Sequence, residues 1–337
     1  MNRSAGKRIV GRPARPGRRI MNRLLHRVEC GLPGRGKGRL RHPPVFILGA
    51  PRCGSTLLYQ LMLDHFDLGY LSNFHCLFYG APSLAERFVR PGKRKRTSSF
   101  RSEYGAVTGW NAPSECGEYW YRFFRRRPQY VPVDEMSEKA KRDLRASMSA
   151  IASAMGRPVL FKNLLCALRL GPITTALPES LFIVVRRDWL DTAHSILESR
   201  RKLFGNYDGW FSVEPRDVGE IEKLPVHEQP IEQIRSVHAL IEEARNRFDP
   251  KRFIDVDYAD LCGDTCSTLD RLADFFDAAG LKPARSGEVP AAFEIKRDVR
   301  IDGELYEKMK DYLKANPPSQ RMPSVDDASA PSESDAK

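Results

Sequence analysis

The stretch 45–58 combines a short apolar run, a glycine-bounded turn and the start of a helical pattern. Residues 49–56 have the spacing Gly-x-x-x-x-Gly-Ser-Thr, close to the phosphate-loop pattern Gly-x-x-x-x-Gly-Lys-Ser/Thr. Backbone N–H groups at a helix start point outward, and the helix dipole favours negative charge there, so the spacing predicts an anion site. Ser55 replaces the lysine that would reach a triphosphate, and Arg52 carries the positive charge instead. We therefore expect the loop to hold a phosphate but not to split a triphosphate.

A second group of polar residues follows the apolar run 181–185. Arg187 comes directly after this predicted strand, and Ser195 lies about two turns into the next helical pattern. An arginine at a strand end and a serine on the following helix can converge on one phosphate, through charge-assisted hydrogen bonds and a hydroxyl donor. Taken alone, the two residues fit a salt-bridged arginine and a serine on the helix surface better than a phosphate site.

Strand and helix patterns alternate along the chain. Apolar runs predict buried strands, and helical spacing predicts helices, at 45–48, 55–66, 137–155, 159–162, 168–176, 181–185, 190–203, 228–248, 253–256 and 264–279. The alternation predicts the α/β class, as a single three-layer domain with a mostly parallel sheet and helices on both faces. Ligands are expected at the carboxyl ends of the strands. We place this domain at 43–315, with 67–135 as an irregular insertion that forms a lid on the acceptor side.

The net charge of +12 lies in the first 42 residues. They hold 13 Lys and Arg against one acid, Glu29, so the rest of the chain holds 42 of each sign (55 − 13 and 43 − 1). We expect 1–42 to be a disordered basic tail, with Met21 as an alternative start, and 316–337 to be a disordered polar tail. The neutral body argues against a nucleic-acid partner. The tail leaves a peripheral membrane contact open.

Other sequence features bound the class of protein. No apolar run approaches the roughly 20 residues of a membrane span. The N-terminal residues lack the apolar core of a secretory signal. Seven cysteines, without the spacing of a disulfide framework or a zinc site, predict reduced thiols in a cytoplasmic protein and no metal centre.

Three motifs together resemble the sulfotransferases that use 3′-phosphoadenosine 5′-phosphosulfate. Residues 51–58, Pro-Arg-Cys-Gly-Ser-Thr-Leu-Leu, are similar to the family loop P-[RK]-[SA]-G-[ST]-[ST]-L-L. Residues 187–195 are similar to R-D-P-x-D-x-x-x-S, and residues 256–261 to the strand end R-Y-E-D-L. The resemblance spans about 45–280 in the family's order. It implies the sulfotransferase fold, which resembles that of P-loop nucleoside triphosphatases.

The resemblance also implies roles for the matching residues. The residues of the loop would bind the 5′-phosphosulfate: Arg52, Cys53, Gly54, Ser55 and Thr56. Arg187 and Ser195 would hold the 3′-phosphate, and Lys162 resembles the family lysine that faces the transferring sulfuryl group. Cys53 replaces the usual serine and Trp189 the usual proline, and neither change removes a charge. Asp257 stands where the third motif usually has arginine.

Three residues are candidates for the base that accepts the proton of the acceptor. His75 lies where many relatives carry a base, and a neutral imidazole accepts a proton near pH 7. Glu115 and Glu118 lie in the segment 111–120, which combines acidic and aromatic residues. Four aromatic residues nearby would stack on a sugar or aryl acceptor or fill the core beneath a lid: Trp110, Tyr119, Trp120 and Tyr121.

We therefore expect a sulfuryl group to pass from 3′-phosphoadenosine 5′-phosphosulfate to an acceptor hydroxyl or amine, leaving adenosine 3′,5′-bisphosphate, without a metal. The acceptor class stays open between carbohydrate, lipid, small molecule and peptide. One alternative is a nucleotide-dependent kinase, which predicts a lysine at the position of Ser55. Another is a non-catalytic nucleotide-binding protein recruited by its basic tail. In that protein, Lys162→Ala would change nothing and deletion of 1–42 would abolish function.

Overall fold

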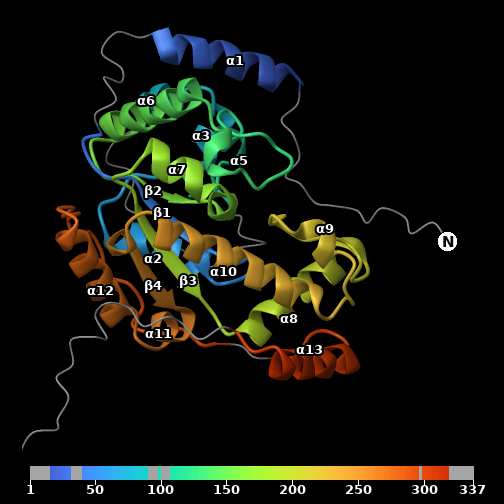
Figure 1. The fold of residues 1–337 in the computed structure, drawn as a ribbon. Coiled ribbons are helices and arrows are strands. Elements are labelled where there is room, and N and C mark those ends of the chain that lie inside the picture. Colours follow the sequence, from blue (N-terminus) through green and yellow to red (C-terminus); the bar gives the residue numbers. More distant parts are fainter. Residues whose placement is uncertain are drawn as a thin grey trace, which may run out of the picture.

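The computed structural model describes residues 16–31, 40–89, 98, 100, 107–295 and 298–318. Four strands form one sheet in the order β2-β1-β3-β4, with every neighbouring pair parallel (Figure 1). Their bounds are β1 Val45–Gly49, β2 Leu160–Lys162, β3 Leu181–Arg186 and β4 Phe253–Asp257. Gly49, the last residue of β1, lies opposite Val185 of β3, and Lys162, the last residue of β2, lies opposite Ile47. The three strands therefore end near one another.

Helices cover both faces of the sheet, which confirms the predicted three-layer α/β domain. One face carries α2 Ser55–His65, α11 Tyr258–Gly263 and α12 Thr265–Ala278. The other carries α6 Glu138–Met155, α7 Leu170–Ala176, α8 Trp189–Phe204 and α10 Gln229–Arg247. Side chains alternate between the faces of a strand, so Phe46 and Leu48 enter one core cluster while Val45 and Ile47 enter the other.

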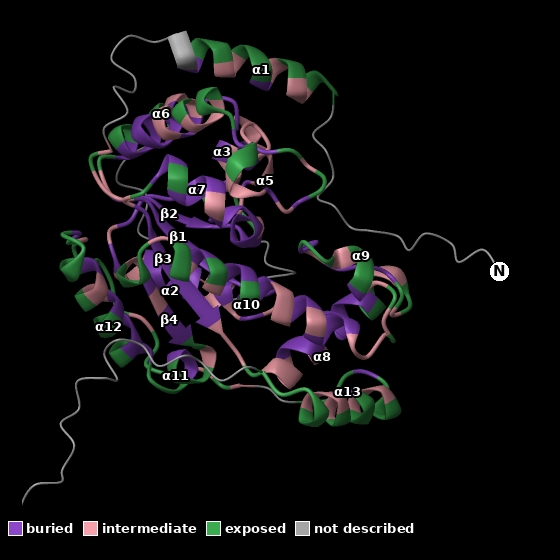
Figure 2. Cartoon of the chain, viewed as in Figure 1, coloured by how far each residue is buried: buried purple, intermediate pink, exposed green. Residues whose placement is uncertain are grey.

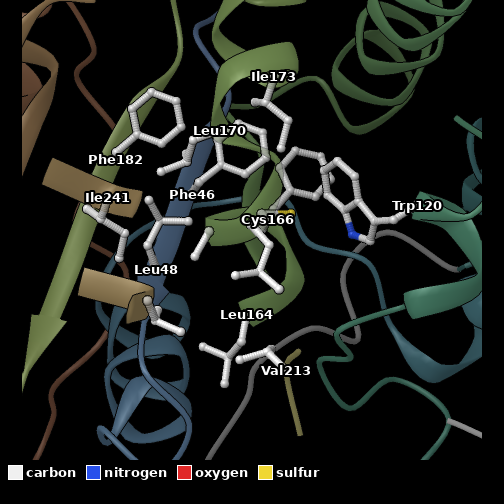
Figure 3. Packing of buried hydrophobic residues seen from close by; sticks show 14 of the residues in the cluster. Phe46, Leu48, Trp120, Leu164, Cys166, Leu170, Ile173, Phe182, Val213 and Ile241 are labelled. Carbon is white, nitrogen blue, oxygen red and sulfur yellow. The ribbon is translucent and has the colours of Figure 1, made fainter. Parts of the chain in front are cut away.

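The strands are buried on both faces, as Figure 2 shows in purple. Phe46 lies between Phe182 and Trp120 in the larger cluster (Figure 3), with ring centroids 5.5 Å and 5.8 Å away. Burial on two faces explains why the strands read as continuous apolar runs rather than as alternating patterns.

The predicted strands and helices end within two residues of the observed ones. Several short elements and two longer helices, one of them in the N-terminal tail, have no counterpart in the prediction. Those that follow β1 are α3 Asn73–Leu77, α4 Pro82–Ala85, η1 Glu86–Phe88, α5 Gly117–Trp120, η2 Val133–Glu135, η3 Leu164–Arg169, α9 Val218–Ile221, η4 Pro250–Arg252, α11 and α13 Gly303–Ala315. Most are a single turn long, too short to produce a helical period in the sequence.

The prediction of a disordered tail is wrong for residues 16–31, which form helix α1 (Pro16–Gly31) on the outside of the molecule near α3 and α6 (Figure 1). Asn22 is 1% exposed, and its side chain accepts from the N–H of Gly80 at 2.6 Å and donates to the carbonyl of Leu77 at 3.0 Å. Charge and low apolar content suggested disorder, but two buried polar residues dock the helix. The rest of 1–42 lies outside the described residues, apart from 40–42, and so does 319–337.

Glu29 makes the second contact between α1 and the domain. Its carboxylate is buried and accepts from the N–H and hydroxyl of Ser83 at 3.1 Å and 2.5 Å, and from Arg122 at 3.4 Å. The backbones of α1 and residue 80 also meet closely, because a Cβ on Gly80 would lie 2.0 Å from the carbonyl oxygen of Asn22. The helix is thus bound to the segment 77–83 by specific contacts.

We predict that Asn22→Ala loosens α1, because it leaves the buried N–H of Gly80 without its acceptor. Such a loss costs about 1–3 kcal/mol. Hydrogen exchange of the α1 amides should become faster by roughly tenfold or more. The control is Arg23→Ala, an exposed position on the same helix, which should stay within about 0.5 kcal/mol of the parent. Unchanged exchange in Asn22→Ala would contradict this account of how the helix is held.

Candidate functional site

The loop between β1 and α2 leaves the N-terminus of α2 without a side-chain cap from the described residues. Gly54 precedes the helix with φ 94°, and a Cβ there would lie 2.2 Å from the ring of Tyr258. Glycine is therefore required both by the backbone conformation and by the close approach of that ring. That the start of α2 binds an anion stays a prediction from the spacing, and the absence of a side-chain cap is compatible with it.

Arg52 joins the two phosphate motifs of the sequence. It adopts φ 68°, which is uncommon for a residue with a side chain, and its Nε donates to Ser195 Oγ at 2.9 Å. Arg187 donates from Nη1 to the carbonyl oxygen of Arg52 at 3.1 Å. Because β1 and β3 are neighbours, the residues that follow them meet at one edge of the sheet. The structure thus brings Arg52, Arg187 and Ser195 together.

Arg187 has spare capacity to bind a ligand. Its guanidinium lies over the ring of Tyr258, 4.8 Å from the centroid. Its Nε is buried and has no hydrogen-bond partner among the residues that the structure describes. A buried donor without a partner is costly in free energy, so an anion at this position would satisfy it. Burial raises the pKa of Tyr258 to about 12, so the phenol stays neutral beside the arginine.

These residues line a pocket of about 290 Å³. Its lining is polar and comes from the loop, α8, the start of α11 and the segment before α13: Arg52, Arg187, Asp191, His194, Ser195, Glu198, Tyr258, Glu294, Asp298 and Arg300. The backbone N–H of Arg300 donates to His194 Nε2 at 2.8 Å, which attaches the C-terminal segment to α8. Burial lowers the pKa of His194, which favours the neutral ring that accepts this bond.

Sequence reasoning missed the part of the pocket that follows residue 280. Arg300 belongs to a segment with no strong periodicity, and nothing in the spacing of its residues indicates that it returns to α8. The sequence could have indicated Tyr258, because it forms part of the third motif. The residues of that motif, 256–261, end β4 and begin α11.

Lys162 ends β2 at the same edge of the sheet as the loop. Its side chain is only 3% exposed and forms an ion pair with Glu115. Asn163 Nδ2 donates to the carbonyl oxygen of Glu115 at 3.0 Å, which fixes the loop that carries the carboxylate. Burial raises the pKa of the Cys53 thiol, while the positive charges of Lys162 and Arg187 act in the opposite direction. Lys162 also lies opposite Ile47 of β1, two residues before that strand ends at the loop.

The other two candidates for the base are engaged elsewhere. Glu118 binds Arg126 through both carboxylate oxygens at 2.6 Å. His75 is fully buried and caps α3, where Nδ1 accepts from the backbone N–H of Ser72 at 3.1 Å and Nε2 lies 3.0 Å from Glu86. Among the three candidates, Glu115 is the one whose carboxylate contacts Lys162.

The four aromatic candidates differ in how far their side chains are exposed to solvent. Tyr119 and Trp120 are buried in the larger core cluster, and Tyr121 lies under the guanidinium of Arg126 at 4.1 Å. Trp110 is 68% exposed, and its ring lies 6.3 Å from that of Phe74. Trp110 therefore remains available for contact with an acceptor.

Within residues 16–318, outside the gaps given above, no cluster of three or more His, Cys, Asp or Glu side chains has an arrangement suited to a metal ion. Over the same residues, no helix combines the length and the apolar character needed to cross a bilayer.

Comparisons with known proteins identify one family. Residues 43–281 match the family model described as "Sulfotransferase family". Omega-hydroxy-beta-dihydromenaquinone-9 sulfotransferase Stf3 from Mycobacterium bovis, and the same-named protein from Mycobacterium tuberculosis, are each 23% identical over 248 residues. That alignment covers 68% of this chain and 61% of each relative, so the chain spans less than two thirds of their length. The crystal structure of sulfotransferase STF9 from Mycobacterium avium shares the fold, with a TM-score of 0.52, 15% identity, and coverage of 90% of this chain and 74% of that one.

Proposed function

The chain belongs to the sulfotransferase family, and from this we propose that it transfers a sulfuryl group from 3′-phosphoadenosine 5′-phosphosulfate to an acceptor hydroxyl or amine. The observation that supports the donor is the joining of Arg52, Arg187 and Ser195 in one pocket beside the uncapped start of α2. Two separate anion-binding features at one site suit a nucleotide with phosphate at both its 5′ and 3′ positions.

The pocket residues divide between the two ends of such a donor. The backbone N–H groups of Gly54, Ser55 and Thr56, with Arg52, would hold the 5′-phosphosulfate, by the charge and dipole effects of a helix start. Arg187 and Ser195 would hold the 3′-phosphate, with the spare Nε of Arg187 as one donor. Ser55 in place of a lysine leaves the loop without the group that would reach a γ-phosphate.

Sulfuryl transfer mainly requires positive charge and hydrogen-bond donors from the protein. A planar SO₃ group passes between two oxygens, and the charge that develops on the leaving phosphate oxygen must be stabilised, as in phosphoryl transfer. Lys162 and Arg52 supply charge at this edge of the sheet. The S–O bond to the acceptor forms as the S–O bond to the 5′-phosphate breaks, and the bisphosphate leaves.

Glu115 is the residue that we propose as the general base. The acceptor oxygen must lose its proton as the new S–O bond forms, and a carboxylate beside Lys162 is placed to accept it. The bond from Asn163 to the Glu115 carbonyl orients the loop without occupying the carboxylate. In this scheme Lys162 leaves Glu115 for the sulfuryl oxygens when the donor is bound.

The acceptor that we propose is a hydroxylated apolar molecule. Trp110 is exposed and lies five positions before Glu115 in the sequence. Its ring contacts that of Phe74. The ring centroids of Phe74 and Phe78 are 5.1 Å apart. These rings offer an apolar surface, and Trp110 belongs to the segment that carries the proposed base. The menaquinone-type acceptor in the name of the Mycobacterium relatives supports the same class.

We predict that Arg187→Ala weakens binding of adenosine 3′,5′-bisphosphate by about tenfold to a hundredfold, because it removes charge-assisted hydrogen bonds to the 3′-phosphate. Isothermal titration calorimetry measures the affinity. The matched control is Arg216→Ala, which removes an arginine that also lies over a tyrosine, at 5.6 Å, but outside the pocket.

Two outcomes would contradict the donor assignment. One is the absence of bisphosphate binding by the parent protein, and the other is an equal affinity in Arg187→Ala. ATP with magnesium raising the melting temperature more than the bisphosphate would favour a kinase instead. Thermal unfolding of the ligand-free variants shows whether any loss of affinity reflects loss of folding.

We predict that Glu115→Gln lowers kcat by about 10²–10⁴-fold, the usual contribution of a positioned base, while the affinity for the bisphosphate stays near the parent value. Glu118→Gln and His75→Gln are the matched controls, since they alter the two other candidates. A larger loss of kcat in either control, at equal bisphosphate affinity and melting temperature, would move the role to that residue.

We also predict which class of acceptor the protein sulfates. A screen with sulfur-35-labelled donor should label apolar alcohols and hydroquinones carrying a hydroxyl in preference to sugars and peptides. Trp110→Ala should raise the KM for the labelled acceptor and leave bisphosphate binding unchanged. Labelling of sugars or peptides alone would overturn the acceptor class and leave the donor assignment standing.

A further inference from the structure

The outward face of α1 carries a stripe of aliphatic side chains. Ile20, Leu24 and Val28 follow one another at intervals of four residues and are 59%, 56% and 53% exposed. Residues at this spacing lie one above the other on a helix. Three exposed aliphatic residues in one row on a docked helix form a continuous apolar strip, unlike the single exposed residues of an ordinary surface.

A stripe of arginines runs beside the aliphatic one. Arg19, Arg23 and Arg27 each precede one of the aliphatic residues, and Arg23 and Arg27 are exposed. The helix contains one acid, Glu29, which is buried and bound to Ser83 and Arg122. The outward face of α1 therefore presents apolar surface and positive charge, with no negative charge on it.

The opposite face of α1 is attached to the domain. Asn22 and Glu29 are buried against the segment 77–83, so the aliphatic and basic stripes are held outward on a fixed support. A helix that had merely exposed a few apolar residues by chance would not need two buried polar side chains to keep its orientation.

We propose that the outward face of α1 binds an anionic membrane surface. An interfacial helix lies in the plane of the headgroups, with aliphatic residues in the acyl boundary and arginines at the phosphates, and α1 offers both kinds of side chain side by side. Each arginine near an anionic leaflet adds attraction, which gives the surface its charge complementarity. A second copy of this chain fits less well, because a two-fold contact would bring the arginine stripes of two α1 helices together.

Docking through α1 would bring the acceptor side of the domain to the bilayer. The segment 77–83 that holds α1 follows directly after α3, whose Phe74 contacts Trp110. A membrane-dissolved acceptor would then reach the protein from the side on which α1 lies. This consequence rests on the proposed acceptor class, whereas membrane binding itself does not.

Flotation of the full chain with vesicles tests the proposal. The parent should bind vesicles of equal parts phosphatidylcholine and phosphatidylglycerol, and bind phosphatidylcholine vesicles weakly. The triple variant Ile20→Ser, Leu24→Ser, Val28→Ser keeps every charge of the chain and should lose about tenfold or more in partitioning. The pair Arg23→Gln, Arg27→Gln should lose roughly tenfold, more at low than at high salt.

A variant with two charges removed elsewhere on the surface is the control for charge. Lys308→Gln, Lys314→Gln removes the same charge from exposed positions of α13 and should bind like the parent. Parent-like binding by the triple variant would overturn the proposal, since attraction by charge elsewhere would then suffice. A dimer in solution that the triple variant abolishes would show instead that a second copy covers the stripe. Circular dichroism and bisphosphate binding report that each variant is folded.

Discussion

The contact between Arg52 and Ser195 is the interaction on which the site depends. It forms because β1 and β3 are adjacent parallel strands, so the loop after one and the helix after the other share a sheet edge. Arg187 extends it by donating to the Arg52 carbonyl, and the Tyr258 ring packs against both Arg187 and Gly54. Side chains from three strand ends are thereby held in place before any ligand arrives, which would lower the ordering cost of the phosphate binding that we propose.

The residues that we propose for the transfer step, Lys162 and Glu115, lie one strand further along the sheet. Lys162 ends β2, the neighbour of β1 on the other side, and its ammonium is buried against Glu115. Burying a lysine is costly unless it is paired, so Glu115 stabilises the buried ammonium of Lys162. In the mechanism that we propose, a sulfuryl group at the loop would compete for Lys162 and release the carboxylate for proton transfer.

The acceptor side is constructed differently from the sheet. Short helices and loops between β1 and α6 are held by side-chain hydrogen bonds, such as the cap of α3 by Ser72 and His75, rather than by a repeating pattern. Helix α1 adds to this layer through Asn22 and Glu29. Regions of this kind tolerate variation in sequence, which would suit the role in acceptor recognition that we propose for this part of the molecule.

By itself, the sequence determined the elements with strong local signals. Buried strands gave continuous apolar runs, long helices gave a clear period, and the glycine-bounded loop with Arg52 indicated an anion site. Only the tertiary structure decided which of His75, Glu115 and Glu118 contacts Lys162, that residues 16–31 dock as a helix, and that Arg300 returns to the pocket. Each of these depends on contacts between segments far apart in the chain. Local spacing carries no record of such contacts, because their free energy arises only when the segments meet.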